Sequence, residues 1–376
     1  MSPIIGKWQD TKTNDTIEFT APGDVIFKSG GYVMTGKYEL IGSDVVKIEL
    51  EGFAGGLMNI FGGDSWEYII SGDTMTITVA GQTSTMKRVV ATPPTSTTKT
   101  AITSPTYSAG KGPRDICSDG SNIWVANYGS NIVTKIKASD GSILGSYSVS
   151  QPYSICFDGT NIWVTNNSGG SVTKINPSDG SIIGTYPVGR SPQTIFFDGT
   201  NIWINTVGNY SITKLNASDG SAKGTYSVGK GQVNICSDGT NIWIANSGSN
   251  SVIKIKASDG SVIGTYPLNS PTDILFDGAN IWVTNTRDNI VTKLKVSDGS
   301  TIGTYPAGKA PSDICFDGTN IWVTNPLDDI VTKLKASDGS VIGTYATGDG
   351  PQAIFFDGTN IWVANNAGDS ITKIKK

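Results

Sequence analysis

In this sequence of 376 residues, the side chains that carry most enzyme chemistry are either absent or occur at the same position of a sequence repeat. There is no histidine, so the usual general base, the usual partner of a nucleophile and the commonest metal ligand are all absent. Four cysteines and 32 Asp and Glu residues remain as candidates. A Ser-His-Asp triad and a Cys-His pair are therefore excluded, and only carboxylate chemistry is left to weigh.

Thirteen of the 27 aspartates recur at two fixed positions of a sequence repeat. One position lies in an Asp-Gly pair, at Asp119, Asp158, Asp198, Asp238, Asp277, Asp317 and Asp357. The other lies in Ser-Asp-Gly, at Asp140, Asp179, Asp219, Asp259, Asp298 and Asp338. Asp side chains accept hydrogen bonds from nearby backbone N–H groups in turns, so these carboxylates are predicted to hold turn geometry.

All four cysteines occupy one position of the repeat, two residues before Asp-Gly: Cys117, Cys156, Cys236 and Cys315. Phe196, Leu275 and Phe355 stand there in the other copies. A position that accepts Cys, Phe or Leu is an apolar packing position. Packing is therefore favoured over a disulfide or a metal site.

Tryptophan and lysine recur in the same way. Each copy contains Asn-Ile-Trp, with Trp124, Trp163, Trp203, Trp243, Trp282, Trp322 and Trp362. A third-strand lysine follows at Lys135, Lys174, Lys214, Lys254, Lys293, Lys333 and Lys373. We expect the tryptophans to pack between repeats, with a multivalent sugar-binding ring as the alternative. We expect the lysines to be a solvated outer feature.

The repeat that positions these residues occurs seven times, with its tryptophans 39 or 40 residues apart. In residues 150–188 it predicts four short strands, Tyr153–Phe157, Ile162–Thr165, Val172–Ile175 and Ile182–Tyr186, separated by glycine-containing turns. No stretch has helical periodicity. A period of about forty residues with four antiparallel strands is typical of a β-propeller blade. The predicted fold is all-β, with a seven-bladed propeller over residues 101–376.

The two ends of the repeat region indicate how the ring closes. The seventh copy stops at Lys376 after its third strand, whereas residues 102–113 match Ile183–Pro192, with Tyr107 in the place of Tyr186. We therefore predict that residues 101–110 supply the fourth strand of the last blade, which leaves no unpaired edge at the seam.

Binding residues are sought where the copies differ, because loops on a rigid scaffold are the usual home of function. The loops between second and third strands and the connections between blades share one face and vary most. Just before the recurring isoleucine stand Asp115, Ser154, Thr194, Asn234, Asp273, Asp313 and Ala353. Six of these seven are polar, so this position is predicted to face the mouth of a central channel. The alternative is neutral drift at solvent-facing positions.

From this pattern we predict a set of ligand-binding residues at the channel mouth. They are Arg114, Asp115, Tyr153, Gln193, Asn234, Asp273, Arg287, Asp313 and Gln352. Asp273 and Asp313 come from adjacent copies, so a bound cation, with calcium as the natural choice for oxygen ligands, is a further hypothesis. Otherwise no cofactor is expected.

Residues 1–90 lack the repeat and are predicted to form a separate small antiparallel sheet or barrel. Strands are expected at Thr16–Phe19, Val25–Phe27, Lys37–Leu40, Val45–Leu50, Trp66–Ile70 and Thr74–Val79. The apolar, glycine-rich stretch Gly52–Gly63 is interpreted as a plug for one end of this barrel, or else as a mobile lip that offers Phe53 and Phe61 to a ligand. Residues 91–100 are a polar Pro/Thr linker.

Composition bounds the partners and the location. The net charge is −4 and 16% of residues are charged, so no basic patch points to nucleic acid. No apolar run approaches the roughly 20 residues that span a bilayer, and no signal peptide opens the sequence. The Ser, Thr, Asn and Gly content favours an extracellular or cell-surface protein, with the periplasm as alternative.

Short motifs add family resemblances. Trp163-Val-Thr-Asn166 and Trp282-Val-Thr-Asn285 resemble the YVTN-type propellers of microbial surface and periplasmic proteins, with Trp in place of Tyr. The seven-bladed streptogramin-lyase-like and NHL propellers are similar, but the lyases rely on histidines that this chain lacks. Ile5-Gly6-Lys7-Trp8 and Gly36-Lys37-Tyr38 resemble small lipocalin-like domains of secreted bacterial proteins.

Three functional hypotheses follow. The leading one is a non-catalytic binding or scaffold protein that holds a protein or glycan on the variable propeller face. The second is an architectural subunit of a self-assembling surface structure. The third is an enzyme with a carboxylate and cation site at the channel mouth, formed by Asp273 and Asp313 with Arg114 or Arg287.

Overall fold

In the computed structural model the chain divides into two compact units, residues 1–94 and 95–376. In the first unit the structure describes the backbone of eight strands. In the second it describes residues 104–376, except for the side chains of Gln232 and Val233. The Gly52–Gly63 stretch and the linker at 91–100 lie outside the described residues.

The first unit contains one antiparallel sheet with the strand order β5-β4-β3-β2-β1-β8-β7-β6. Its strands are β1 (Gly6–Asp10), β2 (Thr16–Thr20), β3 (Asp24–Ser29), β4 (Tyr32–Ile41), β5 (Val45–Glu51), β6 (Glu67–Ser71), β7 (Thr74–Val79) and β8 (Gln82–Arg88). The six predicted strands are all present, and β1 and β8, which the pattern did not predict, pair with each other. The lipocalin-like resemblance stays a prediction.

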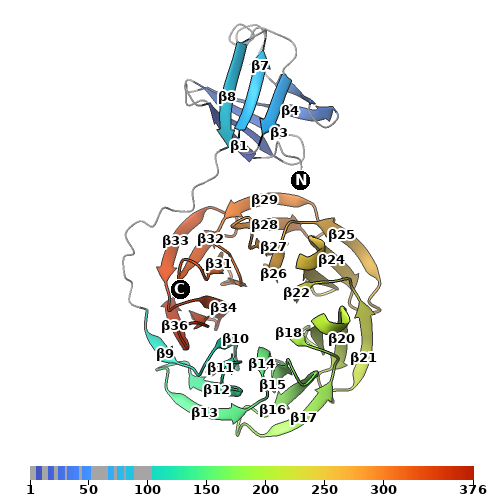
Figure 1. Cartoon of the computed structure of the whole chain (residues 1–376), viewed down its shortest axis with the longest axis vertical. Coiled ribbons are helices and arrows are strands. Elements are labelled where there is room, and N and C mark those ends of the chain that lie inside the picture. Colours follow the sequence, from blue (N-terminus) through green and yellow to red (C-terminus); the bar gives the residue numbers. More distant parts are fainter. Residues whose placement is uncertain are drawn as a thin grey trace. The chain divides into compact units, whose positions relative to one another are not determined.

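The second unit is a seven-bladed propeller in which each blade is a four-stranded antiparallel sheet, so the predicted fold is confirmed (Figure 1). The innermost strands are β10 (Pro113–Ser118), β14 (Pro152–Phe157), β18 (Pro192–Phe197), β22 (Gln232–Ser237), β26 (Pro271–Phe276), β30 (Ile314–Phe316) and β34 (Pro351–Phe356). The second strands are β11 (Asn122–Asn127), β15 (Ile162–Asn166), β19 (Asn201–Thr206), β23 (Asn241–Asn246), β27 (Asn280–Asn285), β31 (Asn320–Asn325) and β35 (Asn360–Asn365).

The outer half of each blade repeats the same order. The third strands are β12 (Ile132–Lys137), β16 (Ser171–Ile175), β20 (Ser211–Asn216), β24 (Ser251–Lys256), β28 (Ile290–Lys295), β32 (Ile330–Lys335) and β36 (Ser370–Lys375). The fourth strands are β13 (Ile143–Ser148), β17 (Ile182–Pro187), β21 (Ala222–Ser227), β25 (Val262–Pro267), β29 (Thr301–Pro306), β33 (Val341–Ala346) and β9 (Thr106–Ser108). Two single-turn 3₁₀ helices, η1 (Val207–Asn209) and η2 (Ser247–Ser249), lie between second and third strands.

The ring closes as predicted, because β9 pairs with β36 and provides the fourth strand of the last blade. Tyr107 is opposite Ile371 in this pairing, and Tyr107 packs near Trp362 with ring centroids 6.0 Å apart. The neighbouring C-terminal residue Lys376 donates from Nζ to the backbone oxygen of Asp317 at 2.6 Å.

The recurring aspartates hold the turns, as predicted. In blade two, Asp158 Oδ1 accepts from the backbone N–H groups of Thr160 and Asn161, and Gly159 has a φ of 88°. The other carboxylate oxygen accepts from the indole N–H five residues later, and this bond recurs in all seven blades at 2.6–2.8 Å. Each aspartate therefore links a turn to the tryptophan of the second strand.

The seven tryptophans fill the interfaces between blades and are completely buried, which confirms packing over a sugar-binding ring. Trp163, for example, lies in a cluster with Ile195 and Ile202 of the next blade. The Tyr186 ring packs against it, with centroids 5.4 Å apart. Tyr186 in turn requires a glycine in the next blade, because a Cβ on Gly220 would lie 2.1 Å from that ring.

The third-strand lysines are not solvated, so that prediction is wrong. Their Nζ atoms lie 4.4–5.3 Å from the tryptophan ring centroid of the same blade. In six blades Nζ also donates to a backbone oxygen of the following blade at 2.6–2.8 Å. The sequence shows a charge at this position, but the carbonyl group that binds it belongs to the next repeat.

Replacing Lys174 with methionine tests this clamp between blades. Lys174 is 4% exposed and donates to the backbone oxygens of Ala217 and Ser218. Methionine retains most of the aliphatic stem but leaves both carbonyl groups without this donor. We expect the free energy of unfolding to fall by about 1–3 kcal/mol, measured by chemical denaturation. The matched change at Lys256, an exposed residue at the end of β24, should have little effect.

The four cysteines are free thiols that are buried or half-buried, as the packing interpretation predicts. Burial raises the pKa of each thiol well above its ordinary value. These groups are therefore protonated and weakly reactive at neutral pH.

Candidate binding site

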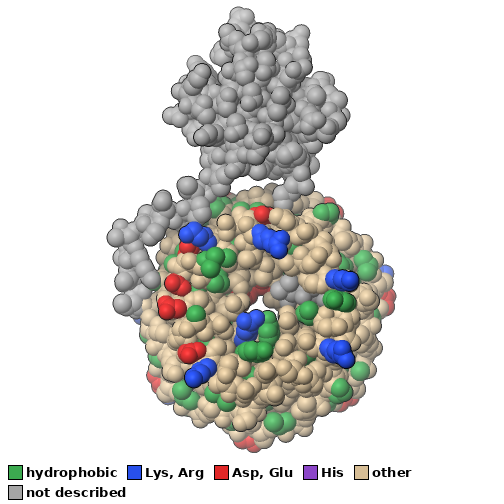
Figure 2. All heavy atoms as spheres, in the orientation of Figure 1, with side chains coloured by type: hydrophobic (Ala, Val, Ile, Leu, Met, Phe, Trp, Pro, Cys, Tyr) green, Lys and Arg blue, Asp and Glu red, His purple; other side chains and the backbone are tan. Residues whose placement is uncertain are grey.

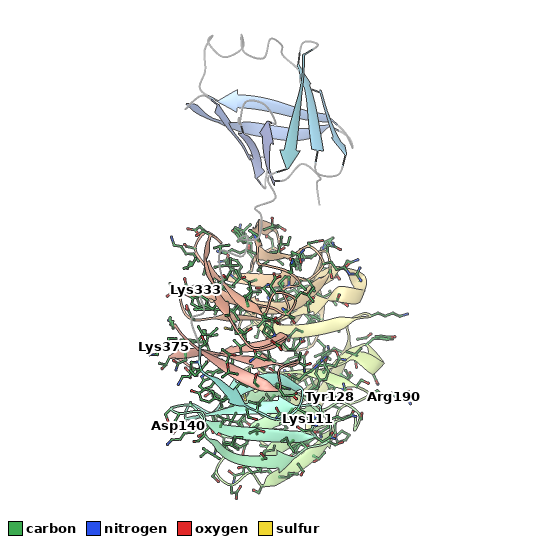
Figure 3. The ribbon with its side chains drawn as sticks, turned by 60° about the vertical axis from the view of Figure 1, so that its left-hand side comes forward. Lys111, Tyr128, Asp140, Arg190, Lys333 and Lys375 are labelled. Carbon is green, nitrogen blue, oxygen red and sulfur yellow. The ribbon has the colours of Figure 1, made fainter. Side chains whose placement is uncertain are left out.

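One face of the propeller carries the variable loops. It is formed by the connections between blades and by the loops between second and third strands, whereas the Asp-Gly and Ser-Asp-Gly turns form the other face. In Figure 3, Lys111, Tyr128 and Arg190 lie on one side of the propeller, and Asp140 and Lys375 lie on the other. We call the first side the variable face.

A central cavity of about 470 Å³ is lined by the innermost strands of all seven blades. Figure 2 shows an opening at the centre of the disc. The lining has three levels. The mouth level consists of Arg114, Tyr153, Gln193, Thr272, Ser312 and Gln352. The middle ring consists of Asp115, Ser154, Thr194, Asn234, Asp273, Asp313 and Ala353. The apolar far end consists of Cys117, Cys156, Phe157, Phe196, Phe197, Cys236, Leu275 and Phe355.

At the mouth level a cation and two aromatic rings form a cluster. The Arg114 guanidinium carbon lies 4.4 Å from the Tyr153 ring centroid, and the same guanidinium donates to the Tyr153 hydroxyl. Tyr128 packs edge-on against Tyr153, with centroids 6.0 Å apart. A register shift between Pro113 and Asp115 interrupts pairing of the innermost strand there. Such a bulge re-aims side chains, and it frees Arg114 from the strand ladder.

The middle ring binds the blades to one another through backbone amides. Asp115 accepts from the N–H of Ile116 in its own blade and from that of Ile155 in the next blade. Asp273 and Asp313 repeat this pattern with Ile274 and Ile314, and with Ile314 and Ile354. Asn234 donates its side-chain amide to Asp273. The ring therefore satisfies main-chain N–H groups of the innermost strands, each of which is an edge strand of its blade.

The three carboxyl groups of the middle ring all have raised pKa values. Burial raises the pKa of Asp115 to about 7, the charge of Asp313 adds to the rise, and the hydrogen bond from Ser154 opposes it. Burial also raises the pKa of Asp273. The pKa of Asp313 rises further, through burial and through the charge of Asp273. Burial therefore disfavours the charged form of all three carboxyl groups.

The structure brings together eight of the nine predicted binding residues. Arg114, Tyr153, Gln193 and Gln352 lie at the mouth, and Asp115, Asn234, Asp273 and Asp313 lie in the ring. Arg287 does not line the cavity; it is exposed in the loop between β27 and β28. Sequence reasoning missed Tyr128 as a partner of Tyr153, although its place in a variable loop was a signal.

The proposed cation site has two adjacent carboxyl groups. Asp273 and Asp313 both accept from the Ile314 N–H. Within residues 104–376 and the described strands, no three Asp, Glu or Cys side chains are grouped closely enough to hold a metal ion. Calcium takes about 6–8 oxygen ligands, so this pair offers few of them, and calcium binding stays a prediction that a melting shift against chelator would test.

The repeat region matches a known family. Residues 149–345, more than half of the chain, match the family described as outer membrane protein assembly factor BamB. The chain belongs to this family. No curated protein matches this BamB-family chain.

Solved structures similar to this BamB-family chain share its propeller. Virginiamycin B lyase from Staphylococcus aureus is 21% identical over 72% of this chain and 98% of its own, with a TM-score of 0.63. A streptogramin B lyase is 22% identical over 71% and 94%, with a TM-score of 0.62. Kuenenia stuttgartiensis hydrazine synthase is 19% identical over 71% and 96%, with a TM-score of 0.59.

At these identities the similarity shows the fold alone. The predicted likeness to streptogramin-lyase propellers is therefore confirmed for architecture, and the YVTN resemblance stays a prediction. Among the described residues no helix is both long and apolar enough to cross a bilayer.

Proposed function

We propose that this chain is a non-catalytic binding and scaffold protein that holds a polypeptide partner on the variable face, over the mouth of the central cavity. The observation that carries the proposal is the Arg114–Tyr153–Tyr128 cluster, which breaks the sevenfold sameness of the ring at that mouth. Arginine and tyrosine are among the residues most enriched where protein partners bind. The opposite face repeats the same turns in every blade.

The family supports a protein partner over a glycan. An outer membrane assembly factor acts with other proteins, and a rigid disc with one variable face suits such a role. The Arg114 guanidinium covers the Tyr153 ring, which leaves less aromatic surface for stacking on a sugar. We place the protein at the outer membrane or cell surface.

The cavity carboxyl groups do not favour an enzyme. Asp115, Asp273 and Asp313 each accept main-chain N–H groups with both carboxylate oxygens. A general acid or base needs an oxygen within reach of substrate. Their raised pKa values have a structural cause, burial inside the closed ring.

The test is capture of proteins from an envelope extract of the source organism by the immobilised full chain. Arg114→Ala/Tyr153→Ala is compared with wild type and with Lys256→Ala/Lys295→Ala, which changes exposed lysines beside the Ser-Asp-Gly turns. We expect a defined protein to be retained by wild type and by the control, and at least tenfold less by the mouth variant. Equal melting temperatures must accompany this result.

Two outcomes would overturn the proposal. One is capture that is equal for all three proteins, which would move binding away from the mouth. The other is retention of glycans, in a parallel panel, that depends on Arg114 and Tyr153 while no protein does.

A further inference from the structure

A loop of the third blade departs from a rule that five other blades follow, while the second blade has Gly170 at the same position. The residue before each third strand adopts the left-handed conformation, as at Asn131, Asn250, Asn289, Asp329 and Asp369. In these five blades its side-chain oxygen accepts a backbone N–H of the next blade connection at 2.8–3.0 Å. Asn and Asp suit both tasks, because they tolerate a positive φ and accept this bond.

Tyr210 stands at this position in the third blade, with a φ of 53°. A tyrosine is disfavoured in this conformation, and its phenol is too long to make the capping bond. The ring is nevertheless 43% exposed on the variable face. A residue that breaks a local rule without a packing gain is a candidate for function.

Two exposed cations flank Tyr210. Arg190 and Lys230 occupy the same position in the blade connections before and after it. Lys230 Nζ lies 5.6 Å from the Tyr210 ring centroid. Asn209 Oδ1 accepts from the Arg190 backbone N–H at 3.0 Å, so the loop fixes the base of the arginine.

These cations lack the ion pair that a related lysine has. Lys309 occupies the same position in a later connection, and its Nζ lies 3.2 Å from Asp328. Among the described residues neither Arg190 nor Lys230 has a carboxylate within ion-pair distance. We name Arg190, Tyr210 and Lys230 the third-blade cluster.

Charge is divided across the variable face. Its loops carry no Asp or Glu from the first blade to the fourth, in residues 127–131, 148–154, 166–170, 187–194, 206–210, 227–234 and 246–250. The loops of later blades carry Asp288, Asp328, Asp329, Asp349 and Asp369. In Figure 2, blue side chains without red ones beside them lie on the right-hand side of the disc, over β18 to β25 and away from the rim. An anionic group that approaches the third-blade cluster is therefore not repelled by negatively charged side chains in these loops.

We propose that the third-blade cluster binds an acidic segment of a polypeptide partner, whose carboxylates contact Arg190 and Lys230 while the Tyr210 phenol adds a hydrogen-bond donor. This inference rests on the proposed function and names the chemistry of its partner. A uniformly charged polyanion or an anionic membrane would also cover the acidic loops of the later blades and be repelled there. A polypeptide can confine its negative charge to one segment.

The experiment measures binding of the full chain to a fluorescent Gly-Ser-flanked hexaglutamate peptide by anisotropy, with hexaglutamine as reference, at low and at 150 mM salt. We expect wild type to prefer hexaglutamate and to lose that preference as salt rises. Arg190→Ala/Lys230→Ala should weaken hexaglutamate binding at least tenfold. The control Lys256→Ala/Lys295→Ala should leave it within twofold.

Tyr210→Asn separates function from folding. Asparagine is the residue type of the first, fourth and fifth blades at this position, so the melting temperature should stay equal or rise while hexaglutamate affinity falls about threefold or more. Hexaglutamate binding that is no better than hexaglutamine binding, or that survives Arg190→Ala/Lys230→Ala, would overturn the inference. Tighter, cluster-dependent binding of heparin oligosaccharide or phosphatidylglycerol vesicles would overturn the polypeptide assignment.

The two proposals can fail separately. If capture from the extract depends on Arg114 and Tyr153 but not on Arg190 and Lys230, the proposed function stands and this inference fails. If hexaglutamate binds through the cluster while the extract yields no protein, the acidic-segment chemistry stands and the proposed scaffold function fails.

Discussion

Replacing Trp243 with alanine is expected to lower the free energy of unfolding by about 3–5 kcal/mol, because a completely buried aromatic side chain leaves a cavity when it is truncated. Trp243 packs against Ile274, Ile281 and Val283 of the next blade, so the cavity would open the interface between blades. The change also removes the donor of the 2.8 Å bond to Asp238 and the ring beneath the Lys254 ammonium group.

Two further variants make this result interpretable. Trp243→Phe keeps most of the packing but loses the indole N–H, so it should cost about 1–3 kcal/mol. Leu327→Ala, at a side chain that is 72% exposed, should change stability by less than about 0.5 kcal/mol. Chemical denaturation followed by far-UV circular dichroism measures all three. A loss below about 1 kcal/mol for Trp243→Ala would contradict the role assigned to these tryptophans.

The propeller could be predicted from the sequence because its information is local and repeated seven times. The strands and the glycine turns each depend on neighbours within one repeat, and so does the bond from Asp158 to the Trp163 indole. The seam was predictable for the same reason, since Tyr107 fits the position that Tyr186 occupies. Contacts between repeats were harder to predict from the sequence. Lys174 binds the oxygen of Ala217, 43 residues later, and no local pattern encodes that partner.

The sequence predicted which residues line the candidate site but not which groups their side chains bind. One register position placed Asp115, Asp273 and Asp313 around the channel, and the structure brings them there. The sequence could not show that these carboxylates accept backbone N–H groups of the next blade. Arg287 was grouped with them as a variable loop residue, yet its loop leaves it outside the cavity.

The free energy of unfolding is expected to fall as pH rises from about 4 to about 7, because of the carboxyl groups of Asp115, Asp273 and Asp313. The pKa of Asp115 is about 7 in the fold against 3.8 for an ordinary aspartate, and burial likewise raises the pKa of Asp273 and Asp313. Between these pH values the folded state binds more protons than the unfolded state, so protonation stabilises the fold. Asp115 alone accounts for a loss of roughly 3 kcal/mol across this window.

The turn aspartates act in the opposite direction below this window. Hydrogen bonds to Ser142 hold the pKa of Asp140 well below its usual range, and hydrogen bonds to Ser340 lower that of Asp338 to about 2. Such groups contribute stability above the unfolded pKa and lose it as pH falls through the folded pKa. The two sets together predict a stability maximum near pH 4.

Asp115→Asn isolates the contribution of the ring. Asparagine already stands at this position in the fourth blade, where the Asn234 side-chain oxygen accepts the Ile235 N–H. In the variant the same bond to Ile116 can form, whereas the amide nitrogen replaces the oxygen that accepts the Ile155 N–H. The variant should therefore lose much less stability than wild type between pH 4 and pH 8, whatever its stability at pH 4. Asp219→Asn, at an exposed turn, should leave the slope between pH 4 and 7 unchanged. A wild-type midpoint that is flat or rising over this interval would show that the ring carboxyl groups are ionised in the fold. The ring would then be held by charge-assisted bonds to the amides of Ile116 and Ile155 without shared protons.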